Sequence, residues 1–176
     1  MRPPSNMRFR AVSVAVLAAI SLCGCAGYRL GPTNGDSPGA RTVQVVAFSN
    51  KTLEPRLGDS VTAALRKEIQ RDATFRLATR QAGDVIVNGE ITGFHRRELS
   101  FVPDDIVSVK DYRLTMTAQV IATERATGKV LFDKPVTGYT MIRVGSDLVS
   151  VERQALPLLA TDLAKQVTSL LADGSW

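Results

Sequence analysis

The stretch that decides the fold is residues 111–123, which read DYRLTMTAQVIAT. Apolar and polar side chains alternate along it with a period of two, which is the side-chain period of a β-strand. One face carries Tyr112, Leu114, Met116, Ala118, Val120 and Ala122, and the other carries Arg113, Thr115, Thr117, Gln119 and Thr123, with Ile121 as the exception. A strand that is apolar on one face only is typical of an antiparallel sheet with one face on the core. The stretch therefore predicts a sheet that is covered on one side.

The chain before this strand predicts a second strand and a loop. Residues 84–99 open with three β-branched residues, and Gly89 and Gly93 inside them indicate a bend or a bulge. Residues 100–108 contain Pro103 and two aspartates, and we expect them to form a loop.

Two further extended segments are expected. Residues 129–144 follow a Thr-Gly turn, and Pro135 makes this strand either an edge strand or a broken one, because proline donates no ladder hydrogen bond. Residues 42–48, which read TVQVVAF, are rich in β-branched side chains and predict a first strand. Residues 75–78 predict a short extended segment.

Two helices are indicated by apolar residues that recur every three or four positions. The first covers residues 58–71, with Val61, Leu65 and Ile69 on its apolar stripe. The second covers residues 147–172, and Pro157 is expected to kink or split it near residues 153–157.

The order of these elements predicts the fold class. The first strand, the first helix and the strand that begins at Val85 are expected to form a right-handed parallel crossover, and the remaining strands form an antiparallel meander. We therefore predict an α/β two-layer sandwich, with a mixed, mostly antiparallel sheet of about four strands and two helices packed on one face.

The amino terminus has the parts of an export signal. Arg2, Arg8 and Arg10 precede an apolar run at 11–22, which is too short for a transmembrane helix of roughly 20 residues. The sequence then reads Leu-Cys-Gly-Cys at 22–25, which is a lipobox ending in Cys25.

The lipobox predicts a lipoprotein with three segments. We expect a lipoprotein signal peptide at 1–24, a lipidated flexible tether at 25–40 that starts with an acylated Cys25, and a single α/β domain at 41–176. An ordinary secretory signal with an unmodified Cys25 is the alternative. Ala26, where an aspartate would retain a lipoprotein at the inner membrane, favours the outer membrane with the domain facing the periplasm.

Charge and composition exclude several function classes. Without the three signal arginines, the 22 basic residues fall to 19 against 17 acidic ones, so the net charge of the remaining chain is +2 and does not favour nucleic-acid binding. His95 is the single histidine, and acylated Cys25 would offer no thiol, so no cysteine–histidine couple is available. Asp104 and Asp105 are better explained as a solvated loop than as a cation site. We therefore expect no catalytic activity, no metal and no cofactor.

Basic residues gather at the expected strand ends. They are His95, Arg96, Arg97, Lys110 and Arg113. Arginine forks suit phosphate groups, so a basic sheet surface could hold phosphorylated lipid head groups. The alternative is ordinary surface charge, offset by Glu98, Asp104, Asp105 and Asp111, and from spacing alone this alternative is favoured.

Several segments, in order, resemble the LPS-assembly lipoprotein family, LptE. They are Gly27-Tyr28 after the lipobox cysteine, VAFSNKT at 46–52, AGDVIVNGEI at 82–91, YRLTM at 112–116, and Val151-Glu152 at the start of a terminal helix that leads to Trp176. Pro157 within that helix departs from the family pattern.

The resemblance implies a function. Members of this family sit partly inside the outer-membrane β-barrel LptD as a plug, help that barrel to fold, and bind lipopolysaccharide (LPS) near its exit into the outer leaflet. The family's phosphate-contacting residues do not align here residue by residue, so our candidates for LPS binding, Arg96, Arg97, Lys110 and Arg113, depend on their position alone. A pilotin-like lipoprotein that escorts another outer-membrane complex and a tethered enzyme are the alternatives, and copurification of an LPS-assembly barrel would separate the first of them from our interpretation.

Overall fold

The computed structural model describes residues 39–80, 82–102, 105–145 and 147–174, with side chains throughout these ranges except at 102–109. All of them belong to one structural unit. The predicted signal peptide, most of the predicted tether and Cys25 lie outside the described residues.

The sheet is mixed and has six strands, in the order β3-β1-β4-β5-β6, with β2 also paired to β4. The strands are β1 (Thr42–Val45), β2 (Ser49–Asn50), β3 (Arg76–Leu77), β4 (Val85–Val102), β5 (Asp105–Glu124) and β6 (Val130–Arg143). The pairs β1–β3, β1–β4 and β2–β4 are parallel, and β4, β5 and β6 form an antiparallel meander. The predicted fold class is confirmed. The number of strands is six and not about four, because the six include β2 and β3, which have only two residues each.

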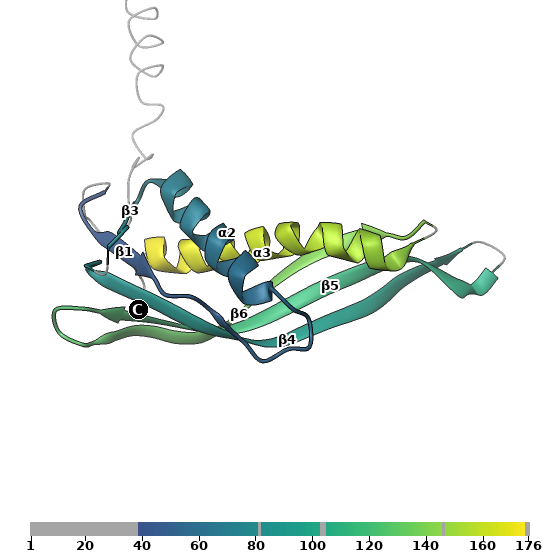
Figure 1. Ribbon diagram of the computed structural model, residues 1–176, viewed down its shortest axis with the longest axis horizontal. Coiled ribbons are helices and arrows are strands. Elements are labelled where there is room, and N and C mark those ends of the chain that lie inside the picture. Colours follow the sequence, from purple (N-terminus) through teal and green to yellow (C-terminus); the bar gives the residue numbers. More distant parts are fainter. Residues whose placement is uncertain (1–38, 81, 103–104, 146, 175–176) are drawn as a thin grey trace, which may run out of the picture. The chain divides into compact units, whose positions relative to one another are not determined.

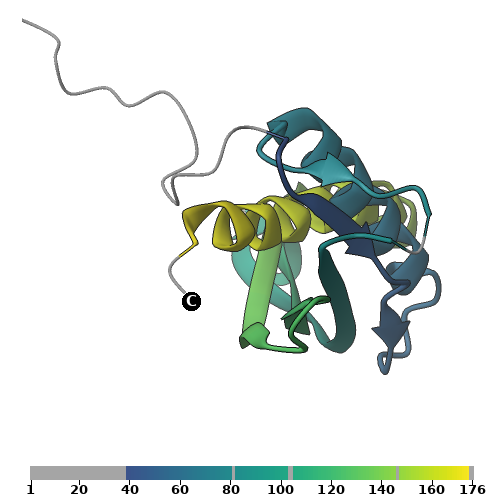
Figure 2. The same cartoon turned by 90° about the vertical axis from the view of Figure 1, so that its left-hand side faces the viewer.

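Both helices lie on one side of the sheet (Figure 1), and the view turned by 90° shows α3 on the same side of the strands (Figure 2). Helix α2 (Leu57–Asp72) buries its predicted stripe, and α3 (Leu148–Asp173) packs against α2, β5 and β6. The predicted split at Pro157 is wrong: α3 runs through this residue, which lies on the exposed side of the helix.

The first predicted strand is interrupted because Phe48 turns into the core. β1 stops at Val45 and the pairing with β4 resumes only at Ser49. Phe48 is buried, and its N–H donates to the Thr62 hydroxyl of α2 at 3.0 Å. Gly89 of β4 makes room for the ring, since a Cβ at this position would lie 2.3 Å from it. The prediction of one continuous strand over 42–48 is therefore wrong at 46–48.

The predicted loop at 100–108 is also wrong. β4 continues to Val102 and β5 begins at Asp105, with these two residues paired. By contrast, β6 is an unbroken edge strand across Pro135, which confirms the first of the two alternatives for that segment.

The core lies between the helices and the sheet. Along β5, Leu114, Met116, Ala118, Val120 and Ala122 are fully buried, and the intervening side chains from Arg113 to Thr123 are half-buried. No described helix packs on the face that carries the second set. We call this face the open face.

Candidate functional site

Arg97 and Arg113 lie directly opposite each other on the open face. Arg97 of β4 is paired in register with Arg113 of β5, and paired residues on antiparallel strands project to the same side of a sheet. Like charges in this position destabilise a strand pair. Arg97 is exposed and has no ion-pair partner among the described residues. We call these two residues the arginine pair.

A bulge at Thr92 places Arg97 on this face. Up to Ile91 the odd-numbered residues of β4 face the core, but Ile91 pairs with Ala118 and Gly93 pairs with Thr117, so Thr92 is an extra residue. From Phe94 to Glu98 the even-numbered residues face the helices. The bend or bulge that Gly93 predicts is therefore confirmed.

The Arg113 guanidinium is held against an aromatic ring. Its Cζ lies 5.3 Å from the centroid of the Tyr139 ring on β6, which is cation–π distance. Its Nε is buried and has no hydrogen-bond partner among the described residues. A buried donor without an acceptor is costly, so this Nε is an unsatisfied polar group beneath the arginine pair.

Arg96, another of the residues predicted to bind LPS, faces the other way. It is paired in register with Leu114, on the helix side of the sheet. Its Nη1 lies 2.8 Å from the Glu152 carboxylate of α3, and its Cζ lies 5.6 Å from the centroid of the Tyr112 ring. The structure therefore separates Arg96 from the arginine pair.

Lys110 and His95 lie near the arginine pair. Val109 pairs with Phe101 and Asp111 pairs with Ser100, so Lys110 is an extra residue at a bulge of β5, where it is half-buried. His95 is exposed on the open face, two residues before Arg97.

The nearby acidic groups do not neutralise the arginine pair. Asp111 accepts hydrogen bonds from the Ser100 hydroxyl and from Arg143 Nε, the latter at 2.9 Å, and these bonds, led by that of Ser100, lower the pKa of its carboxyl. Glu98 is paired with Tyr112 and faces the helix side. The side chains of Asp104 and Asp105 lie outside the described residues. Among the described side chains, no carboxylate therefore forms an ion pair with Arg97 or Arg113.

Exposed apolar side chains lie next to the arginine pair. Met141 is paired in register with Arg113, and Met141 and Tyr139 are 59% and 53% exposed. Leu99 and Phe101, near the end of β4, are also exposed. Tyr139 and Met141 are not among the predicted site residues, although the period of two along β6 places both on the open face. Cations beside apolar groups suit a ligand that is both anionic and amphipathic.

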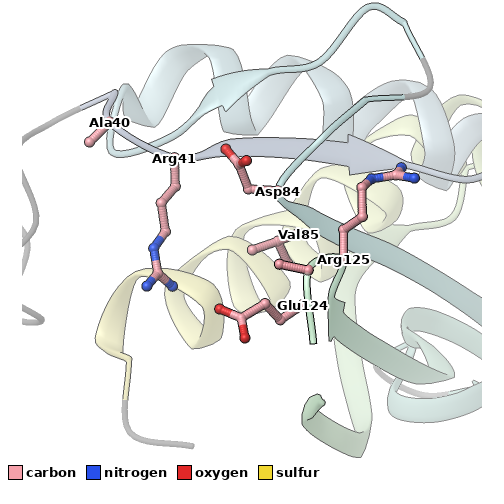
Figure 3. A pocket seen from close by; sticks show the side chains of 7 residues that line it. Ala40, Arg41, Asp84, Val85, Glu124 and Arg125 are labelled. Carbon is pink, nitrogen blue, oxygen red and sulfur yellow. The ribbon is translucent and has the colours of Figure 1, made fainter. Parts of the chain in front are cut away.

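A second candidate is a pocket of about 410 Å³ at the other end of the sheet (Figure 3). Its charged groups already hold the strands together. Asp84 accepts from the backbone N–H and the hydroxyl of Thr42, at 2.8 and 2.7 Å, and these bonds lower the pKa of Asp84. Arg125 donates to the Gly83 carbonyl at 2.7 Å and to the Gln44 side chain. We therefore interpret this pocket as a structural junction.

Two further features of the described residues bear on the chemistry. No three histidine, cysteine, aspartate or glutamate side chains within them come together in a way that could hold a metal ion. No helix in the described part of the chain is long and apolar enough to cross a membrane.

Solved structures share this fold. A protein from Xanthomonas campestris matches with a TM-score of 0.56 and 10% identity, over 82% of this chain and 92% of its own. A hypothetical protein from Chlamydia trachomatis matches with a TM-score of 0.55 and 8% identity, over 75% and 95%. A minor lipoprotein from Acinetobacter baumannii matches with a TM-score of 0.50 and 13% identity, over 75% and 92%. At these identities the matches show the fold alone.

Sequence comparison shows the family. No curated protein is significantly similar to the chain. The family model described as LptE, lipopolysaccharide-assembly, matches residues 40–171, which span almost all of the described residues. This chain therefore belongs to the LptE family of lipopolysaccharide-assembly proteins.

Proposed function

We propose that this protein is an outer-membrane lipoprotein, anchored through Cys25, that forms a complex with the β-barrel LptD and binds LPS. In this proposal it serves as plug and assembly partner of the barrel, on the periplasmic side, and has no catalytic role. Family membership supports a part in LPS assembly, and the lipobox at 22–25 supports the anchor, as does the lipoprotein among the structures of the same fold.

The arginine pair is the observation that carries the proposed LPS binding. The lipid A part of LPS combines phosphate groups with acyl chains. Arg97 and Arg113 present guanidinium groups that suit phosphate oxygens. Tyr139 and Met141 offer apolar contact beside these groups. Lys110 adds a further cationic residue close to the arginine pair.

The rest of the open face supports the proposed plug. Its central side chains on β5 include the polar, uncharged Thr115, Thr117 and Gln119, and the hydroxyls of Thr117 and Thr137 lie 3.2 Å apart. The carboxylate of Glu90, which is paired in register with Gln119, is neutralised by Lys51 at 2.7 Å. The interior of a large outer-membrane barrel is polar. A polar sheet face can therefore lie against such an interior without leaving buried polar groups unpaired.

A titration with purified LPS tests the binding site. Losing one charge-assisted hydrogen bond should cost about 1.5–3 kcal/mol of binding free energy, which is roughly a tenfold to hundredfold weakening. The double variant Arg97→Ala, Arg113→Ala should therefore bind LPS at least roughly tenfold more weakly than the wild-type protein. The difference should shrink at high salt, because salt screens exposed charges.

Arg96→Ala is the matched control, since Arg96 lies on the other face of the same strand. This variant should bind LPS as the wild-type protein does, and all variants should still copurify with the barrel. If the double variant folds and its affinity for LPS is unchanged, the arginine pair is ordinary surface charge. If a different outer-membrane complex copurifies with the protein, the pilotin-like alternative holds.

A further inference from the structure

The exposed edge of β6 has the features of a segment that adds strands. Residues 136–142 read VTGYTMI, with no charged residue and no proline. Tyr139 and Met141 within this segment are more than half exposed. A short, uncharged, β-rich segment on a sheet edge is a template for pairing with another chain.

The direction of the backbone groups on this edge follows from two hydrogen bonds. The N–H of Val144 donates to the Lys110 carbonyl at 2.8 Å, so the N–H groups of even-numbered residues point toward β5. The N–H of Tyr139 donates to an Asp162 carboxylate oxygen at 2.9 Å instead. The odd-numbered N–H groups therefore point away from the sheet, and Pro135, at one of these positions, has none.

Asp162 reaches Tyr139 because α3 lies unusually close to β6. A Cβ added at Gly138 would lie 2.7 Å from the backbone nitrogen of Leu163. The absence of a side chain at Gly138 therefore lets the helix backbone approach the strand, and Asp162, the residue before Leu163, comes within hydrogen-bond distance of the edge. The Asp162 carboxylate therefore accepts a hydrogen bond from the N–H of Tyr139, the middle residue of the 136–142 segment.

On the opposite side of the sheet, at β1 and β3, a positively charged side chain of the other helix binds a free backbone carbonyl. The Val43 carbonyl accepts the N–H of Ala78 just beyond β3, and the Val45 carbonyl, two residues later, points to the same side past the end of that strand. Arg66 of α2 donates to the Val45 carbonyl at 3.1 Å. Each helix thus supplies one charged side chain to a free backbone group of the sheet.

We propose that Asp162 closes β6 against strand addition by a second copy of this chain. Two identical 136–142 segments can pair antiparallel across a two-fold axis, because such a contact is self-complementary. A second copy would have to place a backbone carbonyl where the Asp162 carboxylate now lies, and the two oxygens would repel each other. The N–H of Tyr139 is already hydrogen-bonded, and Pro135 has no N–H. Toward the end of β6 at Arg143, only the N–H groups of Met141 and Arg143 therefore remain available in succession to pair with a second chain.

The test compares Asp162→Ala with Asp162→Asn in the full chain, purified in detergent. Asn keeps an acceptor oxygen at nearly the same place, and Ala removes it at a half-buried helix position where it favours the helix. Light scattering after size-exclusion chromatography reports the number of copies, and hydrogen exchange reports protection of the Tyr139 amide. We expect Asp162→Ala to form dimers or larger assemblies and Asp162→Asn to keep the wild-type mass.

Two more variants make the result specific. Lys165→Ala removes an exposed charge from the same helix and should leave the mass unchanged. Thr137→Lys, which places a charge on the edge strand, should return the Asp162→Ala variant to the wild-type mass. Asp162→Ser, whose side chain is too short to reach Tyr139, replaces Asp162→Ala if the latter does not fold. The proposal is overturned if Asp162→Ala or Asp162→Ser folds, loses protection at the Tyr139 amide and keeps the wild-type mass. It is also overturned if the variant associates and Thr137→Lys leaves that association unchanged.

Discussion

At the scale of single residues, Thr92 decides which side chains of β4 lie on the open face. It is the extra residue between Ile91 and Gly93, and it reverses the facing of the residues that follow it in β4 up to the next bulge, at Leu99. Without it, Arg97 would point toward the helices and Arg96 toward the open face. One inserted residue therefore selects which of two neighbouring arginines joins Arg113.

The first prediction concerns the two faces of β5. Leu114→Asp should prevent folding, because an unpaired carboxylate at a fully buried position costs several kcal/mol, against a whole stability of about 5–15 kcal/mol. Thr117→Asp should be tolerated, since Thr117 lies half-buried on the open face, with its hydroxyl 3.2 Å from that of Thr137. Circular dichroism and thermal melting provide the measurement. A folded Leu114→Asp protein beside an unfolded Thr117→Asp protein would reverse our assignment of the faces.

Residue periodicity predicted part of the candidate site. The alternation around Leu114 places Arg113 on the open face, which the structure confirms. Adjacent residues of a strand face opposite sides, so the sequence indicates that Arg96 and Arg97 are separated, but not which of them joins Arg113. That choice depends on the bulge at Thr92. The position of a bulge is set by how two strands pair, and it produces no periodic pattern in the sequence that would reveal it.

At the scale of elements, α3 begins at a well-formed cap. Asp147 precedes the helix in an extended conformation, and its carboxylate accepts from the N–H groups of Val149 and Ser150 at 3.0 and 3.3 Å. Its hydrogen bonds, led by the one with Ser150, lower the pKa of Asp147 below its usual value of 3.8. The cap therefore stabilises the folded state in the ionised form.

The second prediction follows from the sign of this shift. Because the pKa is lower in the folded protein, the stabilisation is complete above the ordinary pKa and is lost as the pH falls through the folded value. Asp147→Ala should lower the melting temperature at about pH 7, and the gap from the wild-type protein should narrow toward about pH 3. Melting curves across this range provide the measurement. A gap that stays constant would show that the charge of Asp147 does not contribute.

The elements that the sequence missed are those whose local pattern is interrupted. Pro103 and the two aspartates after it predict a loop at 100–108, and bulges at Leu99 and Lys110 leave no alternation to oppose that prediction, although β4 continues to Val102 and β5 begins at Asp105. Pro157 removes one backbone donor, but it lies on the exposed side of α3, and the packing of the helix on the sheet and on α2 holds it together. Tertiary packing decided both cases.

At the scale of the whole molecule, the fold was predictable because strands and helices alternate in an order that permits few arrangements. The mixed sheet with both helices on one face follows from that order and from the one-sided apolar pattern of residues 111–123. The short strand β2 was not predictable as a strand, since two residues carry no period, whereas β3 lies within the extended segment predicted at 75–78. They exist because β4 and β1 provide partners for them.

The third prediction concerns the anchor of the whole protein. Cys25→Ser should leave an unprocessed or mislocalised precursor, because the proposed acylation requires the thiol. Metabolic labelling with a radioactive fatty acid should mark the wild-type protein and leave the variant unlabelled. Label retained on the Cys25→Ser protein would refute the assignment of this residue as the lipidation site.

The central claim is that LPS binds at the end of the open face that carries the arginine pair, and site-specific photo-crosslinking in living cells tests it most directly. A photoreactive amino acid at Met141, which is exposed and paired with Arg113, should form a crosslink to LPS. The same group at Lys165, exposed on α3, should not. The Met141 crosslink should weaken when Arg97 and Arg113 are both replaced by alanine. LPS crosslinked from Lys165 and not from Met141 would contradict the account and place the ligand on the helix side.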